Sequence, residues 1–171
     1  MKDNYDFIRA ISGFKDLSNQ AVRVAIADAQ LKHFVTESWM IEGLEPTEGD
    51  IEAHEQFLKL ETVTVGDMIS FVRMIAPGNE LRARKGMNVE VGGYRPPPGG
   101  PSIWGELAGI LKRQEDSTAY RVHQRYEQLH PFEDGNGRSG RVLWLWMMGG
   151  SAPLGFLHKW YYQSLAEGGD R

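Results

Sequence analysis

The chain has 171 residues, of which 41% are hydrophobic and 25% charged, a size and balance typical of one globular domain with a buried core. A net charge of -4, from 19 basic and 23 acidic residues, provides no basic stripe and disfavours binding to nucleic acid or to a membrane. The absence of cysteine excludes disulfides, a thiol nucleophile and cysteine-ligated zinc. The N-terminal MKDNYDFIRA lacks the apolar core of a signal peptide and the run VLWLWMM is too short to span a bilayer, so we expect a soluble, cytoplasmic protein.

Helical periodicity dominates the sequence and predicts an all-α, mainly helical fold in a single domain over residues 1–171. The first predicted helix is the longest and runs from about residue 19 to 42, because apolar residues recur there at steps of three and four. Gly43 is a plausible end for it. Four further helices are expected nearer the C-terminus, over residues 102–112, 117–129, 136–148 and 153–165.

Two more helices are predicted from their N-terminal capping signals. Thr47 and Thr64 are each followed three positions later by an aspartate, which is the pattern of an N-cap with an acidic residue in the first turn. We therefore expect helices that run from Thr47 toward Leu60 and from Thr64 toward Ile75.

The segment from residue 82 to 100 has a different pattern. Val89 and Val91 are β-branched and alternate with the polar residues Asn88 and Glu90, and a Gly-Gly pair comes directly after them. Alternation followed by such a turn signal predicts a short β-hairpin, or an extended flap, on the otherwise helical domain.

The stretch HPFEDGNGRSGR, at residues 130–141, ends one predicted helix and opens the next. Gly135 and Gly137 allow its backbone to come close to a ligand, and the first N–H groups of the following helix have no partner within that helix. Phe132 is interpreted as a buried anchor for the loop. A glycine-rich loop at a helix N-terminus indicates an anion site, with phosphate as the expected anion.

The charged side chains of this stretch extend that interpretation. Arg138 and Arg141 are three positions apart, so both project from one face of the helix and can hold phosphate oxygens in bidentate fashion. Asp134 is placed to hold Mg²⁺, which commonly takes only one or two protein carboxylates. His130 has the unperturbed pKa that suits a proton acceptor near neutral pH. The loop therefore predicts a site for a nucleoside triphosphate.

Taken singly, each of these residues has an ordinary structural explanation. A histidine at a helix end is more often structural than catalytic, and two arginines on a helix face are usually solvated. A zinc hydrolase is disfavoured on other grounds, because none of the five histidines forms the H-E-x-x-H pattern.

The combination is more specific, because HPFEDGNGRSGR resembles the signature of the Fic family, His-Pro-Phe-any-(Asp/Glu)-Gly-Asn-Gly-Arg-any-any-Arg. The resemblance extends over roughly residues 36–165. It implies a helical fold and transfer of AMP from ATP to a Ser, Thr or Tyr hydroxyl of a target protein, which can be the protein itself. It also implies that the flap at residues 88–94 registers the target backbone by strand addition.

The resemblance assigns a role to both ends of the loop. His130 would deprotonate the target hydroxyl, which then attacks the α-phosphorus of ATP and releases pyrophosphate. Asp134 would hold the Mg²⁺ that bridges the α- and β-phosphates. Positioning and charge neutralisation are most of what such a transfer requires of a protein.

The same resemblance assigns the phosphate contacts. Gly135, Asn136 and Gly137 would form the anion hole through the Asn136 residue and the backbone N–H groups. Arg138 would contact the β-phosphate and Arg141 the γ-phosphate.

A second motif lies at the end of the first predicted helix, in SWMIEG. Ser38 and Glu42 are four positions apart and share a face, and Glu42 lies in the last turn, where the helix dipole disfavours a carboxylate. With Gly43, the stretch resembles the Fic inhibitory motif, (Ser/Thr)-any-any-any-Glu-(Gly/Asn). It implies a self-inhibited protein in which a helix at about residues 19–43 brings Glu42 to Arg141 and blocks the γ-phosphate.

Several questions stay open at this point. The loop does not exclude UTP, GTP or CDP-choline as donor, and in some relatives the glutamate assists removal of AMP. A binding or regulatory module, in which Glu42 never releases Arg141, is the alternative outside enzymes. The target and the oligomeric state cannot be read from the sequence, and a homo-oligomer remains one of the alternatives.

Overall fold

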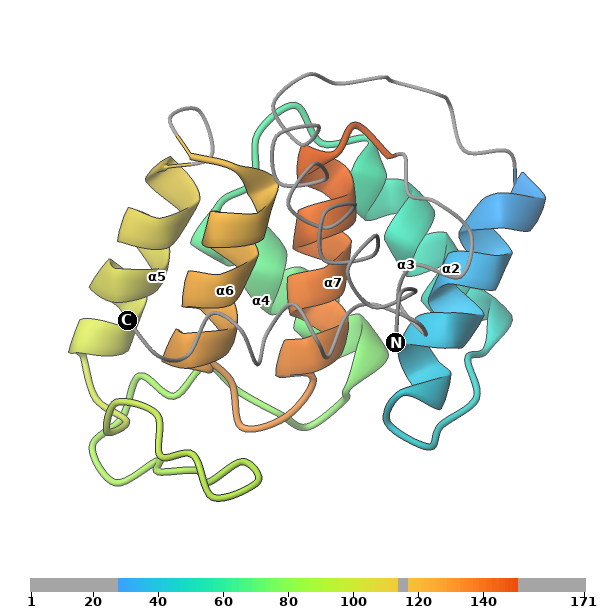
Figure 1. Ribbon diagram of the computed structural model, residues 1–171. Coiled ribbons are helices and arrows are strands. Elements are labelled where there is room, and N and C mark those ends of the chain that lie inside the picture. The colour runs from blue at the N-terminus through green and yellow to red at the C-terminus, as the bar shows by residue number, and fades with distance from the viewer. Residues whose placement is uncertain (1–27, 114–116, 151–171) are drawn as a thin grey trace, which may run out of the picture.

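The computed structural model describes residues 28–113 and 117–150, and within these residues the protein is helical (Figure 1). Isolated bridges are the only β-structure in the described part, which confirms the predicted all-α class. No helix in the described ranges is long and apolar enough to cross a membrane. The helices, numbered as in Figure 1, are α2 (Asp28–Met40), α3 (Glu48–Leu58), α4 (Val65–Ile75), α5 (Ser102–Lys112), α6 (Ala119–Leu129) and α7 (Asn136–Met147).

Helices α3 and α4 begin at the two predicted caps. The Thr47 main-chain N–H donates to Asp50 Oδ2 at 2.7 Å, and the Asp50 N–H donates to Thr47 Oγ1 at 3.3 Å. Thr64 and Asp67 form the same reciprocal pair at 2.8 and 3.3 Å. These capping boxes satisfy N–H groups that a helix start leaves unpaired, and each stabilises its helix by about 1 kcal/mol.

Helix α2 ends in a left-handed glycine turn. The Leu44 N–H donates to Trp39 O at 3.1 Å and the Gly43 N–H donates to Met40 O at 3.0 Å, with Gly43 at φ +71°. This pair of hydrogen bonds is a Schellman motif, which satisfies the last carbonyls of the helix and favours glycine at this position. It places Glu42 as the last residue of the helical path. The predicted start near residue 19, and the predicted helix over 153–165, lie outside the described residues.

The predicted hairpin is reduced to a single tight turn. Val91 and Tyr94 exchange two main-chain hydrogen bonds of 2.9 and 2.8 Å, and Gly92 and Gly93 both have positive φ, as a type I′ turn requires. No further ladder forms among the described residues, so a β-hairpin flap is not confirmed. Three prolines at residues 96–98 follow the turn, and proline cannot donate to a ladder.

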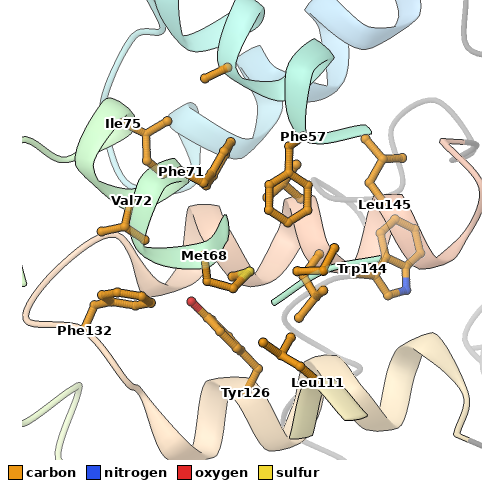
Figure 2. Close-up of a cluster of buried hydrophobic side chains, with 14 of the residues drawn as sticks. Phe57, Met68, Phe71, Val72, Ile75, Leu111, Tyr126, Phe132, Trp144 and Leu145 are labelled. Atoms are coloured by element: carbon orange, nitrogen blue, oxygen red, sulfur yellow. The ribbon is translucent and has the colours of Figure 1, made fainter. Parts of the chain in front are cut away.

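Helix α7 is the centre of the fold and contacts α2, α3, α4 and α6. Its residues Val142, Leu143 and Leu145 are completely buried. Figure 2 shows aromatic and aliphatic side chains from the surrounding helices converging on it, among them Phe57 and Phe71. Burial of each such side chain contributes about 1.5–3 kcal/mol, so the core fixes α7 and with it the loop that enters its N-terminus.

Figure 1 shows that three segments distant in sequence meet at one end of the molecule. These are the C-terminal end of α2, the loop between α6 and α7, and the long connection between α4 and α5. The charged residues singled out from the sequence lie on these segments or, for Arg138 and Arg141, on the start of α7 that the loop enters.

Candidate active site

The loop between α6 and α7 has a left-handed residue at each end. His130 has φ 48° and ψ 61°, and its N–H caps α6 by donating to Tyr126 O at 2.9 Å. Gly135 has φ 78° and precedes α7, where a Cβ atom would lie only 3.1 Å from Ala76 Cβ. Within the described residues, His130 is the one non-glycine residue with positive φ. Such a conformation costs about 1 kcal/mol or more, and retained strain of this kind clusters at functional sites.

The side chain of Asn136 holds the shape of this loop. Its amide nitrogen donates to Phe132 O and its Oδ1 accepts from the Phe132 N–H, both at 2.9 Å. Phe132 is buried and bridges to Leu81, as expected of a loop anchor. Asn136 is only 2% exposed and its side chain is engaged with the loop, so its main-chain N–H at the start of α7 is the group left to face a ligand.

Arg82 ties the loop to the neighbouring connection, and sequence reasoning missed it. The buried guanidinium donates to the carbonyls of Leu129 and His130, at 2.9 and 2.7 Å, and to those of Met87 and Pro97, at 3.1 and 3.0 Å. One side chain therefore joins the α6 end of the loop to the segment that carries the glycine turn. An isolated arginine outside any motif gives no sequence signal for such a role.

His130 is half-buried and neutral at pH 7. Burial, and then the charge of Arg82, lower the pKa of His130 to about 4, against smaller opposing effects of a main-chain hydrogen bond to Glu127 and of the Asp134 charge. A neutral imidazole has one nitrogen able to accept a proton. The orientation of the ring is restrained by the Glu127 contact and the left-handed backbone.

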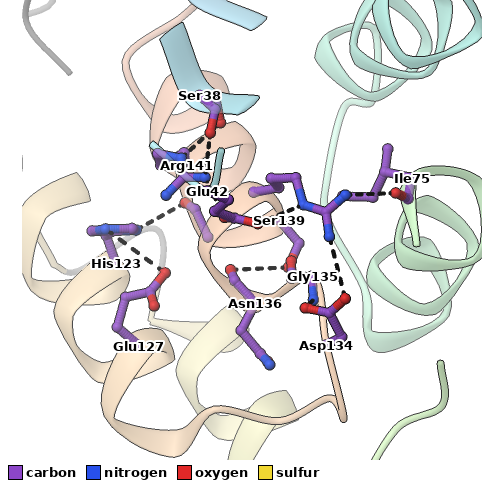
Figure 3. A network of polar contacts seen from close by, with 12 residues as sticks. Ser38, Glu42, Ile75, His123, Glu127, Asp134, Gly135, Asn136, Ser139 and Arg141 are labelled. Carbon is purple, nitrogen blue, oxygen red and sulfur yellow. Dashed lines mark hydrogen bonds and ion pairs between the residues drawn. The ribbon is translucent and has the colours of Figure 1, made fainter. Parts of the chain in front are cut away.

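Glu42 contacts both arginines of the loop motif, and Figure 3 shows its contact with Arg141. Its Oε1 lies 2.5 Å from Arg141 Nη2, and its Oε2 lies 2.8 Å from Arg138 Nε. The Glu42 side chain is 25% exposed, whereas those of Arg138 and Arg141 are 5% and 2% exposed. The contact with Arg141 was expected from the sequence, and the contact with Arg138 was not. Arg138 also donates from Nη1 to Ile75 O at 2.8 Å.

Ser38 completes the contact between α2 and Arg141. Arg141 Nε donates to Ser38 Oγ at 2.7 Å, and Nη2 donates to Ser38 O at 2.8 Å. Ser38 is completely buried, one turn before Glu42 on the same helix face. The stretch SWMIEG therefore contacts the stretch HPFEDGNGRSGR directly, through Ser38 and Glu42 on one side and Arg141 on the other.

Asp134 is a loop carboxylate that is open to solvent, with a side chain 61% exposed. Its Oδ1 accepts from the Gly135 N–H at 2.6 Å, and its Oδ2 lies 3.5 Å from Arg138 Nη2. No group of three or more potential ligand side chains occurs among the described residues. One accessible carboxylate fits an ion such as Mg²⁺, which takes most of its ligands from phosphate and water.

The Glu42 carboxylate lies against the N-terminal turn of α7. A Cβ atom at Gly137 would come within 2.7 Å of Glu42 Oε1, so glycine is required there for this approach. The first hydrogen bond within the helix is from the Ser139 N–H to Gly135 O, at 2.9 Å. The N–H groups before Ser139 point out of the helix end, where an anion is favoured. A negatively charged group thus lies beside the helix start at which the sequence predicts an anion.

Most of the site residues predicted from the sequence line one cleft with a volume of about 610 Å³. It brings together the loop, the end of α2 and the extended segment before the glycine turn. Of the predicted residues, Ser38, Gly43, Asn88 and Gly135 do not line it, and Asn88 instead accepts the Gly99 N–H through Oδ1 at 3.0 Å. The predicted residues that line it are Glu42, Val89, Glu90, Val91, His130, Asp134, Asn136, Gly137, Arg138 and Arg141.

The sequence of this chain is similar to those of known proteins. Residues 88–148 match the profile of the Fic/DOC family. A protein from Drosophila willistoni named Protein adenylyltransferase Fic is 34% identical over 104 residues, which cover 50% of this chain and 19% of that protein. A protein of the same name from Culex quinquefasciatus is 32% identical over 133 residues, 66% of this chain and 26% of that protein. The chain therefore spans about a quarter or less of the length of these curated relatives.

Proposed function

Because the chain belongs to the Fic/DOC family, we propose that it transfers AMP from ATP to a hydroxyl side chain of a target protein, and that its own Glu42 inhibits this transfer. The observation that carries the proposal is the cleft itself. It holds a neutral histidine, two buried arginines and a helix N-terminus, with a carboxylate of α2 lying on the arginines.

In this proposal His130 is the general base. The hydroxyl proton of the target moves to the ring, the hydroxyl oxygen bonds to the α-phosphorus, and the bond from that phosphorus to the bridging oxygen breaks, releasing pyrophosphate. A base with a pKa of about 4 is weak, but the negative charge of a bound triphosphate raises the pKa of His130 toward neutrality. Neutrality of the ring before binding keeps it ready to accept the proton.

Arg138, Arg141 and the first turn of α7 hold the triphosphate in this proposal. Both guanidinium groups are buried and prearranged, so they neutralise the phosphate charge with little reorganisation. Asp134 would hold Mg²⁺, whose chemistry is to neutralise charge on the phosphate oxygens and on the leaving pyrophosphate. The Asp134 side chain is accessible for this purpose once a nucleotide supplies further oxygen ligands.

Inhibition follows from competition for the same donors. Glu42 binds with its two carboxylate oxygens to the groups that a γ-phosphate would need, Arg141 above all. A triphosphate placed against the first turn of α7 would bring like charges together, which is unfavourable in a partly desolvated cleft. Wild-type protein is therefore expected to bind ATP weakly.

The segment before the glycine turn is the proposed docking site for the target. Val89, Glu90 and Val91 line the cleft, and no described main-chain partner bonds to residues 89 and 90. An extended peptide could pair with this exposed backbone edge while its hydroxyl side chain reaches His130.

The test uses ATP labelled at either the α- or the γ-phosphate. Glu42→Gly protein is expected to incorporate label into itself or into lysate proteins from α-labelled ATP only, because the β- and γ-phosphates leave as pyrophosphate. Glu42→Gly with His130→Ala is the matched control and is expected to lose about 10² to 10⁴ in rate while it still binds ATP. Equal labelling in both variants would contradict the role of His130. Binding of ATP without any labelling would favour a non-catalytic regulatory module. Labelling from UTP, GTP or CDP-choline, but not from ATP, would mean that the enzyme uses that nucleotide as its donor.

A further inference from the structure

Arg138 is contacted by an aromatic ring of helix α2 as well as by Glu42. Trp39 is 2% exposed, and its ring centroid lies 5.3 Å from Arg138 Cζ. A guanidinium over an indole face at this distance is a cation–π contact, and Trp gives the strongest contact of this kind. Trp39 stands in the motif SWMIEG at a position that the inhibitory pattern leaves unspecified.

The Trp39 ring is itself held rigidly. It meets His54 edge-to-face at 5.3 Å, and His54 meets Phe71 in the same way at 5.0 Å. His54 is completely buried, and its Nδ1 lies 2.7 Å from Asp50 O. Burial lowers the pKa of His54 to about 4, so the ring beneath Trp39 is neutral at pH 7 and adds no charge that opposes Arg138. A series of edge-to-face ring contacts therefore connects the α3–α4 core to Arg138.

The Arg138 guanidinium lies near two carboxylates, one main-chain carbonyl and the Trp39 ring, and the proposed activation withdraws one of the carboxylates, that of Glu42. Glu42 Oε2 lies 2.8 Å from Nε, yet the buried Nε forms no hydrogen bond of good geometry. Asp134 is 3.5 Å from Nη2 and largely exposed, and Ile75 O accepts from Nη1. Once Glu42 withdraws, the Ile75 carbonyl and the Trp39 ring are the buried groups that hold the guanidinium, with Nε left to donate to another acceptor.

We infer that Trp39 is a positioning residue, which holds Arg138 so that its unpaired Nε faces the phosphate chain of the nucleotide. The inference rests on the proposed function, in which Arg138 meets the β-phosphate. Helix α2 then has two opposing effects on the same site: Glu42 blocks the nucleotide, and Trp39 prepares the arginine for it.

The test measures binding of ATP, ADP and AMP, with Mg²⁺, by titration calorimetry. The parent protein carries Glu42→Gly and His130→Ala, so that it is released from inhibition and does not turn over. Trp39→Leu in this parent is expected to weaken ATP and ADP by about tenfold and AMP by less than twofold, because AMP has no β-phosphate. Trp39→Phe keeps an aromatic face and is expected to weaken ATP and ADP by only about threefold.

A second background separates positioning from packing. In the parent with Arg138→Ala added, Trp39→Leu is expected to change ATP binding by less than twofold, since the group that it positions is gone. Equal weakening of all three nucleotides, no weakening at all, or a tenfold loss that persists without Arg138, would each overturn the inference. If Trp39→Leu does not fold, the Trp39→Phe comparison decides by the same criterion. A parent that binds no ATP would refute the proposed function instead.

Discussion

Replacing Glu42 by glutamine removes one negative charge while keeping the shape of the side chain and the Schellman end of α2. In the wild type the carboxylate accepts a charge-assisted hydrogen bond of 2.5 Å from Arg141, and it forms an ion pair of 2.8 Å with Arg138 Nε that lacks hydrogen-bond geometry. A hydrogen bond to a charged group contributes about 1.5–3 kcal/mol. Because the Glu42 side chain is 25% exposed, solvent screening reduces the sum, and we take about 1.5–3 kcal/mol for both contacts together.

This range corresponds to a factor of roughly 10 to 100 in an equilibrium constant. Glu42→Gln is therefore expected to bind ATP about 10 to 100 times more tightly than wild type and to label itself correspondingly faster at low ATP. Glu45→Gln is the matched control, an exposed glutamate three residues further along that should change neither quantity. The double variant with Arg141→Ala should keep part of the gain, because Arg138 is released as well. Equal ATP affinity in wild type and Glu42→Gln would refute the competition on which inhibition is argued.

Three other changes test separate parts of the structure. Asp134→Ala in the Glu42→Gln protein should abolish Mg²⁺-stimulated labelling, and a full rate in a Mg²⁺ titration would mean that the ion is held elsewhere. Arg82→Lys cannot span four carbonyls and should lower the free energy of unfolding by about 2–4 kcal/mol in urea denaturation; an unchanged value would show that the carbonyls find other partners. Burial lowers the pKa of His54 and of His123 from 6.5 to about 4. Between these values the unfolded chain binds more protons than the folded protein, so the free energy of unfolding should fall as the pH drops from about 6.5 toward 4. The expected loss is about 3 kcal/mol per histidine. Urea midpoints that are equal at pH 7 and pH 4.5 would contradict this.

Local patterns explain what could be predicted from the sequence. The caps at Thr47 and Thr64 depend on a partner three residues away, and the structure forms both. Residues 130–141 are contiguous, so their placement around one helix start follows from chain geometry. The contact of Glu42 with Arg141 spans 99 positions and was reached only through a family resemblance. Its presence is a structural fact, and its inhibitory role stays a proposal.

Contacts that depend on the tertiary path of the chain could not be predicted in the same way. Arg82 meets carbonyls 47 and 48 positions away, and a carbonyl has no signature in sequence. The Trp39 ring reaches Arg138 only because α2 packs against α7. The side chain of Asn136 spans the loop because two buried main-chain groups of Phe132 require partners, and the sequence motif does not indicate this contact. The alternation at 88–91 gives only a single turn, because the prolines at 96–98 cannot donate main-chain hydrogen bonds to a ladder.

The position of Glu42 breaks a local rule, and the surrounding structure shows how that is tolerated. A carboxylate at the C-terminal end of α2 faces the negative end of that helix dipole, which costs about 0.3–1 kcal/mol. The same carboxylate lies at the N-terminal turn of α7, whose dipole favours it by a similar amount, so the two dipoles nearly cancel. What holds Glu42 is then the pair of arginines, whose contacts are worth more than either dipole. A ligand that takes over both guanidinium groups removes nearly all of the attraction and leaves the unfavourable end of α2. Displacement of Glu42 is therefore expected to require an anion that engages both arginines at once, as the Glu42 carboxylate does.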